Sequence, residues 1–398
     1  MTLRLAILIS HPIQHFAPWH REVAKLPGID LRVYFYCDWG VASYMDPEFQ
    51  ISLEWDVPLV EGYAHEFLSI DKRPERLNFF QVDNPGVCEA LNYFDPHVVK
   101  VFGYAYRTNW RVAKWTKRLR KPLMIYSDSN IRAQPKWWKR EIKERVVRHF
   151  YRYVDGALYV GDNNLAYHRY FGLPDHRIFP GVLPIDRQQL HKVVPDPIAV
   201  RRELREQLGI PQEAFVVMFC GKYVPRKRPL DLVISAHNVA SKGLPVWSLL
   251  VGEGPERANI QSVCQQEGIK NVVLTGFVNQ SKISTYFAAA DVIAVTSQYD
   301  PHPLVVSEGA SFGLPIIASD QLGCIGVNDT ARPDVNALVY ACGDQGQLSN
   351  CIERLYGDCT LYRSMSQASI RISEQQDVKV AAQELAFAAN QLHEIGPR

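Results

Sequence analysis

Short apolar runs, rich in β-branched and aromatic residues, alternate along the chain with longer stretches of helical character. This alternation is typical of parallel βαβ units, in which each buried strand is followed by a covering helix. The runs of the first half are Leu5–Ile9, Leu31–Tyr36, Val98–Phe102, Leu123–Tyr126 and Ala157–Val160. Those of the second half are Phe215–Cys220, Trp247–Val251, Val272–Leu274, Val292–Thr296, Ile316–Ser319 and Leu338–Tyr340. The pattern predicts two consecutive doubly wound α/β sheets.

The segment VVPDPIAV (193–200), with its two prolines, separates the two series of strands. We expect a Rossmann-like domain over 1–192, a linker over 193–200 and a second Rossmann-like domain over 201–377. The last residues, 378–398, contain an amphipathic helical stretch that we expect to pack on the first domain. Two such domains predict a cleft between them, and ligands of doubly wound sheets bind at the carboxyl ends of the strands.

The composition, 47% hydrophobic and 22% charged, is that of an ordinary globular protein. The first apolar run, Leu5–Ile9, is too short for a signal peptide, and no stretch approaches the ~20 apolar residues of a membrane span. The eight cysteines include no CxxC pair, which favours reduced thiols. We therefore expect a cytoplasmic protein.

The candidate chemistry is densest in TSQYDPHPLVVSEGASFGLPIIASD (296–320). A helix is predicted to begin near Pro303 and to end at Gly313, so its free backbone amides open at the end of a strand and attract a phosphate. Asp300 precedes the helix and Glu308 lies one turn into it, and each carboxylate can accept two hydrogen bonds from sugar hydroxyls. A helix cap and a solvated side chain are the alternatives. The apolar neighbours of Glu308 argue against the second, because burying an unpaired carboxylate is costly.

The same segment resembles the signature of glycosyltransferase family 4, also called group 1: an acidic residue, seven positions, a glutamate, a small-residue helix and Gly-x-Pro. The resemblance implies a GT-B fold, in which two Rossmann-like domains face each other across a cleft. It also implies that Glu308 binds the ribose of a nucleotide donor, that Asp300 acts catalytically beside the transferred sugar, and that His302 and Leu304 contact the donor. Asp300 replaces the commoner glutamate, and Pro303 replaces a glycine and so removes one amide.

Two further segments resemble the same family. FCGKYVPRKRPLDLVISA (219–236) places Gly221, Lys222 and Lys227 where the family holds the donor diphosphate, and charge-assisted hydrogen bonds there would stabilise the leaving nucleotide. LLVGEGPER (249–257) adds Gly252 and Glu253 to the implied donor site. Taken alone, the basic residues would be a solvated loop. The order of the three segments favours the donor site instead.

In the first half, SHPIQHF (10–16) follows the first strand and resembles family members that act in surface-polysaccharide synthesis. The resemblance implies that His11, Gln14 and His15 face the donor or acceptor, although a structural role is equally compatible with them. Asp128, in YSDSN (126–130), is a second catalytic candidate that could also cap the following segment.

Residues 107–152 hold 15 basic and three acidic residues. A solvated helix face is one interpretation. A patch for peripheral contact with the inner face of a membrane is another, because Trp137 and Trp138 lie among lysines and lipid-linked acceptors sit at bilayers. We expect no nucleic-acid partner, because no recognised binding motif accompanies the charge.

The resemblance implies transfer of a sugar from a nucleoside-diphosphate donor, with retention, to a hydroxyl of a saccharide or lipid-linked acceptor. We expect no metal and no cofactor, the nucleotide sugar being a co-substrate; no Asp-x-Asp stands at a strand end. A sugar-nucleotide epimerase on the same fold and a non-catalytic nucleotide-sugar binder remain alternatives. A P-loop kinase is excluded, because the chain lacks G-x4-G-K-[ST].

Overall fold

The structure, a computed structural model, describes the chain apart from residues 1, 42, 47–50 and 132–136 and the side chains of residues 53 and 137–139. It divides into two units, each built around its own parallel sheet. Unit 1 comprises Met1–Tyr44, Pro58–Pro184 and Val378–Arg398, and unit 2 comprises Met45–Val57 and Ile185–Asp377. Two Rossmann-like α/β domains are therefore confirmed.

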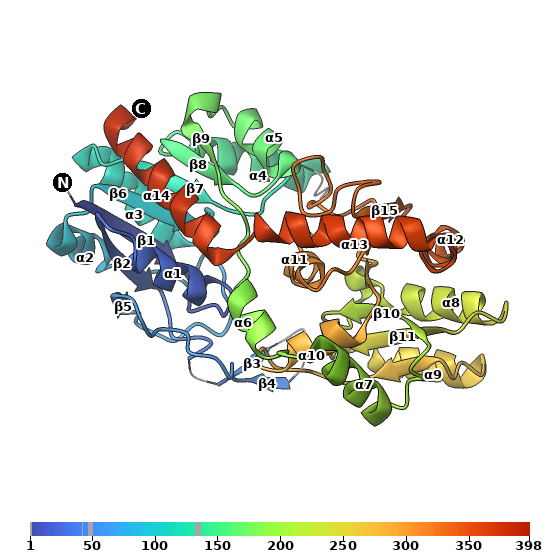
Figure 1. The fold of residues 1–398 in the computed structure, drawn as a ribbon. Coiled ribbons are helices and arrows are strands. Elements are labelled where there is room, and N and C mark those ends of the chain that lie inside the picture. Colours follow the sequence, from blue (N-terminus) through green and yellow to red (C-terminus); the bar gives the residue numbers. More distant parts are fainter. Residues whose placement is uncertain (1, 42, 47–50, 132–136) are drawn as a thin grey trace. The chain divides into compact units, whose positions relative to one another are not determined.

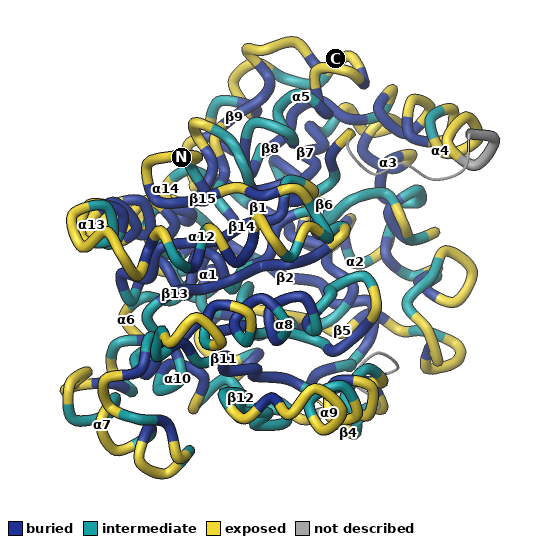
Figure 2. Tube along the Cα trace, turned by 90° about the vertical axis from the view of Figure 1, so that its right-hand side faces the viewer, coloured by how far each residue is buried: buried dark blue, intermediate teal, exposed yellow. Residues whose placement is uncertain are grey.

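The sheet of unit 1 has the strand order β5-β2-β1-β6-β7-β8-β9, and neighbouring strands run parallel. Its strands are β1 (Leu3–Ile9), β2 (Ile29–Phe35), β5 (His65–Phe67), β6 (Val98–Phe102), β7 (Leu123–Tyr126), β8 (Gly156–Tyr159) and β9 (Ile178–Pro180). Its helices are α1 (Phe16–Ala24), α2 (Val87–Phe94), α3 (Arg107–Leu119), α4 (Trp137–Phe150), α5 (Asp162–Tyr170), η1 (Asp175–Arg177) and α14 (Val378–Ile395). The central strands are buried on both faces, as the dark tube along them in Figure 2 shows. This burial explains why the sequence presents them as continuous apolar runs.

The sheet of unit 2 has the parallel order β12-β11-β10-β13-β14-β15. Its strands are β10 (Phe215–Cys220), β11 (Val246–Val251), β12 (Val272–Leu274), β13 (Val292–Val295), β14 (Ile316–Ser319) and β15 (Ala337–Tyr340). Its helices are α6 (Arg187–Lys192), α7 (Pro197–Gln207), η2 (Pro225–Lys227), α8 (Pro229–Ala240), α9 (Arg257–Gln266), α10 (Ile283–Ala289), α11 (Leu304–Ser311), α12 (Gln345–Gly357) and α13 (Cys359–Glu374). The short strands β3 (Tyr44–Asp46) and β4 (Ile51–Leu53) form a separate two-stranded sheet. Alternate residues of β10 enter two separate cores, Val216 and Met218 on one face and Val217 and Phe219 on the other.

The domain boundaries differ in detail from those expected from the sequence. The division between the units falls at Pro184–Ile185, and residues 197–200, expected as the end of the linker, form the first turn of α7. Asp196 caps the start of α7, because its side chain accepts hydrogen bonds from the amides of Ile198 and Ala199, and Pro197 suits the first helical position. The prolines of 193–200 therefore start a helix.

Three further features concern the last helix, the apolar character of the helices and the cysteines. Helix α14, the red helix of Figure 1, belongs to unit 1 and packs along α1. None of the helices in the described part of the chain is both long and apolar enough to cross a bilayer. All eight cysteines lie among the described residues, and none forms a disulfide.

A lysine lies in the core of unit 1. Lys100, in the middle of β6, is fully buried, and its Nζ atom is 3.5 Å from the ring centre of Trp19, 4.3 Å from that of Phe102 and 4.5 Å from that of Tyr126. The Nζ atom has no hydrogen-bond partner among the described residues. Burial therefore lowers the pKa of Lys100 well below its ordinary value of 10.5.

We expect Lys100→Met to stabilise unit 1 by about 1–3 kcal/mol near neutral pH, because methionine fills the same aromatic site without an unpaired polar group. Since the folded pKa lies below the unfolded one, the unfolded state binds more protons, and the wild type should gain stability as the pH rises toward 10.5. The variant should lack this gain. Calorimetric melting of both proteins across this pH range measures the difference. Lys114→Met, at an exposed position of α3, is the control and should change little. A melting temperature of Lys100→Met below that of the wild type near neutral pH would contradict the prediction.

Candidate functional site

The strand order of unit 2 reverses at β10, which lies between β11 and β13. At such a switch point the loops that follow the two central strands diverge and leave a crevice at the carboxyl edge of the sheet, where ligands of doubly wound sheets bind. The loop after β10 carries Lys222 and Lys227, and the loop after β13 carries Asp300. The topology therefore brings together residues that lie more than 70 positions apart in the chain.

Lys227 and the buried Asp300 form an ion pair across this switch point. Lys227 Nζ donates a hydrogen bond to Asp300 Oδ2, and the side chains are 18% and 9% exposed. The backbone of the lysine is fixed as well, because the Thr296 hydroxyl lies 2.8 Å from the Lys227 carbonyl oxygen and 2.9 Å from that of Arg228. The two loops are thus joined both through side chains and through backbone.

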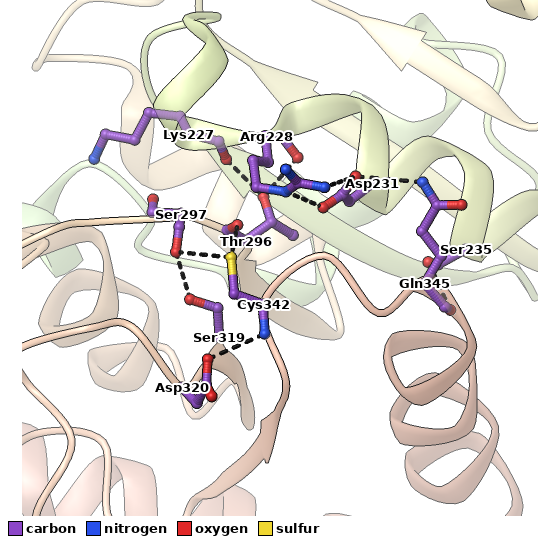
Figure 3. A network of polar contacts seen from close by, with 10 residues as sticks. All are labelled: Lys227, Arg228, Asp231, Ser235, Thr296, Ser297, Ser319, Asp320, Cys342 and Gln345. Carbon is purple, nitrogen blue, oxygen red and sulfur yellow. Dashed lines mark hydrogen bonds and ion pairs between the residues drawn. The ribbon is translucent and has the colours of Figure 1, made fainter.

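Arg228 is part of the network that holds this loop, which Figure 3 shows from close by. Its φ of +51° makes a left-handed turn before α8, and its guanidinium Nε donates to Asp231 Oδ2 at 2.6 Å. The amide of Gln345 lies 3.3 Å from the other oxygen of Asp231. In the figure the side chain of Lys227 extends away from these contacts. Arg228 is therefore a structural part of the turn.

Lys222 has a carboxylate partner that the sequence did not indicate. Its Nζ atom lies 3.1 Å from Asp46 Oδ2 and 3.2 Å from Oδ1. The side chain of Asp46 is 10% exposed. Asp46 ends the short strand β3 and is grouped with unit 2, although it precedes most of unit 1 in the chain. Because Asp46 lies 176 positions from Lys222 in the chain, no local spacing pattern in the sequence indicates this ion pair.

Helix α11 begins after Pro303 and carries Glu308. Glu308 is only 6% exposed, and its Oε1 atom lies 3.3 Å from the amide Nε2 of Gln280. Burial raises the pKa of Glu308 from 4.5 to about 7, so its charge changes in the neutral range. The expectation of a buried carboxylate is confirmed, and Gln280 is a neighbour that sequence reasoning missed.

His302 and Leu304 flank the start of α11. His302 is buried, burial lowers its pKa to about 4, and its Nε2 atom has no partner among the described residues. Leu304 is half-buried against the core under the helix. The histidine is therefore neutral, with a ring nitrogen that can still form a hydrogen bond.

The glycines that the sequence analysis expected at a donor site lie in close contact with backbone of the protein itself. A Cβ atom on Gly252, whose φ is +145°, would lie 1.9 Å from the carbonyl oxygen of Gly221. One on Gly254 would lie 2.6 Å from the carbonyl oxygen of Tyr223. Glu253, between them, accepts a hydrogen bond from Arg257 at 2.9 Å. The immediate role of Gly252 and Gly254 is thus to let the loops after β10 and β11 pack backbone against backbone.

The candidates in unit 1 lie on the loops after β1 and β7. Nδ1 of His11 lies 2.9 Å from the Ser10 hydroxyl, and Nε2 of His15 lies 3.2 Å from the Gln14 amide. Burial lowers the pKa of both histidines to about 4. Asp128 is exposed. His11 and His15 are therefore neutral near pH 7, and Gln14 is the hydrogen-bond partner of His15.

Residues 200–371 match the family model for glycosyl transferases group 1. The lipopolysaccharide core biosynthesis glycosyltransferase LpsD of Rhizobium meliloti is 32% identical over 163 residues, which are 41% of this chain and 45% of that protein. The 2-deoxystreptamine glucosyltransferase of Streptomyces kanamyceticus is 28% identical over 183 residues, 43% of this chain and 46% of that one. The chain thus matches less than half the length of these relatives.

Two solved structures share the fold over nearly the whole chain. HepE of Anabaena, in complex with UDP, superposes with a TM-score of 0.73 at 16% identity and covers 98% of this chain and 100% of that one. Sucrose-phosphate synthase of Thermosynechococcus elongatus has a TM-score of 0.70 at 18% identity and covers 99% and 100%. The chain has the GT-B fold.

We expect Glu308→Gln to remove a pH-dependent loss of stability from unit 2. Because the folded pKa of about 7 lies above the ordinary 4.5, the wild type should lose stability as the pH rises from below 4.5 through 7, by up to about 3 kcal/mol. The variant has no charge to bury. Calorimetric melting at pH 5 and pH 8 checks this, with Glu267→Gln at an exposed position of the same unit as control. Equal pH dependence in the wild type and Glu308→Gln would show that Glu308 is ionised without cost.

Proposed function

We propose, because residues 200–371 match the family model for glycosyl transferases group 1, that this chain transfers a sugar from a nucleoside-diphosphate donor to a hydroxyl acceptor. The transfer retains the anomeric configuration, needs no metal ion, and serves the synthesis of a polysaccharide or glycoconjugate. The observation that supports this most directly is the Lys227–Asp300 ion pair at the switch point of unit 2, beside the start of α11.

In this proposal each candidate site residue of unit 2 that is named below has its own role. Lys222, Lys227 and the first amides of α11 bind the diphosphate, and charge-assisted hydrogen bonds stabilise it as it leaves. Glu308, when ionised, accepts hydrogen bonds from the ribose hydroxyls. Asp300 orients hydroxyls of the transferred sugar and keeps the ammonium of Lys227 in place.

The reaction breaks the bond between the anomeric carbon and the phosphate oxygen, and the electron pair leaves with the nucleoside diphosphate. The acceptor hydroxyl attacks the oxocarbenium-like carbon from the side that the phosphate leaves. The acceptor proton passes to an oxygen of the departing phosphate. In this proposal Asp300 forms no covalent bond to the sugar.

A uridine nucleotide is the first donor to test, because HepE was solved in complex with UDP-glucose. Binding to the folded state alone raises the melting temperature, so UDP, GDP and ADP can be compared by thermal shift before any product is measured. LpsD acts in lipopolysaccharide core biosynthesis, which makes saccharide and lipid-linked saccharide acceptors the first to try.

We expect Asp300→Asn and Lys227→Ala each to lower the rate of transfer by about 10²–10³-fold, because each removes preorganised charge from the reacting centre. Radiolabelled sugar transferred from UDP-glucose to a mixture of saccharide acceptors provides the measurement. Lys242→Ala, an exposed lysine of the same unit, is the control and should keep full activity. Full activity in either site variant would refute the assignment, and an isomerised sugar nucleotide in a donor-only incubation would identify an epimerase instead.

The basic segment 107–152 supports a further part of the proposal, peripheral docking to an anionic membrane surface. Helix α4 exposes Ile142 at 58% and Val146 at 43% among exposed Lys143 and Arg145. Helix α3 adds exposed basic residues beside it, and the two helices are joined where the Trp110 ring contacts Phe150 at 5.0 Å. Apolar side chains flanked by cations match the boundary between headgroups and acyl chains. Trp137 and Trp138, which suggested this contact, have side chains outside the described part.

We expect the protein to sediment with vesicles of phosphatidylcholine and phosphatidylglycerol and not with pure phosphatidylcholine. Lys143→Glu with Arg145→Glu should weaken this binding at least about tenfold, since each basic residue near an anionic surface contributes about 1 kcal/mol. Charge reversal of the exposed Arg202 in unit 2 is the matched control. Equal binding to both kinds of vesicle, or an unchanged double variant, would leave 107–152 as a solvated face.

A further inference from the structure

A cavity of about 320 Å³ opens on unit 1 in the loop between β5 and α2, within residues 70–85. Because neighbouring strands of this sheet run parallel, the loop after β5 leaves from the same edge as the loop after β1, which holds His11. That is the edge where doubly wound sheets bind their ligands. No residue of this cavity was a candidate from the sequence.

The loop is held in one conformation by its own polar groups. The side-chain oxygen of Asn78 accepts hydrogen bonds from the amides of Phe80 and Gln81, both at 3.0 Å, and Gln81 in turn accepts one from the amide of Arg76 at 2.7 Å. At the base of the loop the fully buried Asn84 donates to the Ser69 carbonyl oxygen at 3.0 Å. The cavity is therefore preformed.

Phe80 lines this cavity and is 84% exposed, so its ring is accessible to a ligand. An aromatic face with hydrogen-bonding groups nearby suits a pyranose ring, which has an apolar C–H face and an edge of hydroxyls. Gln81 and Asp83 supply such groups in the same lining. The carboxylate of Asp83 stays charged, because its hydrogen bond from Arg111 lowers its pKa.

The charges of the lining favour an uncharged sugar over an anion. Its two basic residues already have carboxylate partners: Lys72 Nζ lies 3.1 Å from Glu75, and Arg73 Nε lies 2.8 Å from Asp38. An anionic ligand would have to compete with these carboxylates, whereas neutral hydroxyls can share them.

One wall of the cavity leads to the candidate acceptor residues. The indole Nε1 of Trp39 donates to the carbonyl oxygen of Pro74 at 3.1 Å, and Pro74 lines the cavity. The centre of the Trp39 ring lies 6.3 Å from that of His11. Trp39 thus connects the cavity lining with His11 through these two contacts.

We propose that this cavity binds a neutral hexopyranose unit of the acceptor, stacked on Phe80; as an acceptor site it rests on the proposed function. Saturation-transfer NMR with the methyl glycosides of glucose, galactose and mannose at about 10 mM detects the weak binding expected of a single sugar. Irradiation of the aromatic protons should transfer magnetisation to the C–H face of at least one glycoside. Phe80→Ala should reduce this signal about three- to tenfold, the loss expected for one aromatic contact.

Two variants keep the test specific. Tyr93→Ala removes an aromatic side chain of α2 that is 85% exposed and should leave the signal unchanged, while Phe80→Tyr should preserve it. No signal from any of the glycosides with the wild type, or an equal signal with Phe80→Ala, would overturn the proposal. A thermal shift with UDP-glucose on the same preparations tests the donor site separately. If that shift is present and the glycosides fail to bind, the acceptor cavity is refuted while the donor assignment stands.

Discussion

The carboxyl edge of the sheet in unit 2 depends on an ion pair between two loops that the strand order brings together. β10 and β13 are neighbours, and the loops that follow them leave from one edge, so Lys227 and Asp300 meet although 73 positions separate them. Burying either charge alone would be costly, and pairing offsets that cost. The contacts of Thr296 with the carbonyl groups of the lysine loop then fix where the pair lies. The ion pair is therefore both a structural joint between the loops and the centre of the proposed chemistry.

The glycines around this joint have a structural explanation that does not need a ligand. The loops after β10 and β11 approach so closely that any side chain on Gly252 would collide with backbone. The approach leaves Tyr223 to donate its amide to the Glu253 carbonyl oxygen at 2.8 Å. Backbone packed in this way cannot give way easily, so the lysine-bearing loop starts from a rigid base.

The sequence predicted the long buried strands and the principal charged residues of unit 2, because both leave local signals. Buried parallel strands appear as apolar runs, and strand ends followed by glycine and lysine are recognisable. β5 and β9 escaped notice, since His65–Phe67 is exposed and Ile178–Pro180 ends in a proline. Asp46 and Gln280 were missed for another reason: their partners are distant in the chain. Lys100 was hidden inside an otherwise apolar strand.

Lys222 and Lys227 both have carboxylate partners from the chain itself, so a diphosphate that binds both lysines must compete with Asp46 and Asp300. The two carboxylates are not equally held. Asp300 is anchored through its backbone, whose carbonyl oxygen accepts a hydrogen bond from the Gly323 amide at 2.9 Å. Asp46 ends a strand of three residues in a two-stranded pair, an element with little stability of its own. In the proposed reaction, competition by phosphate would therefore act first on the Lys222–Asp46 contact, and Asp300 would stay in place to meet the sugar.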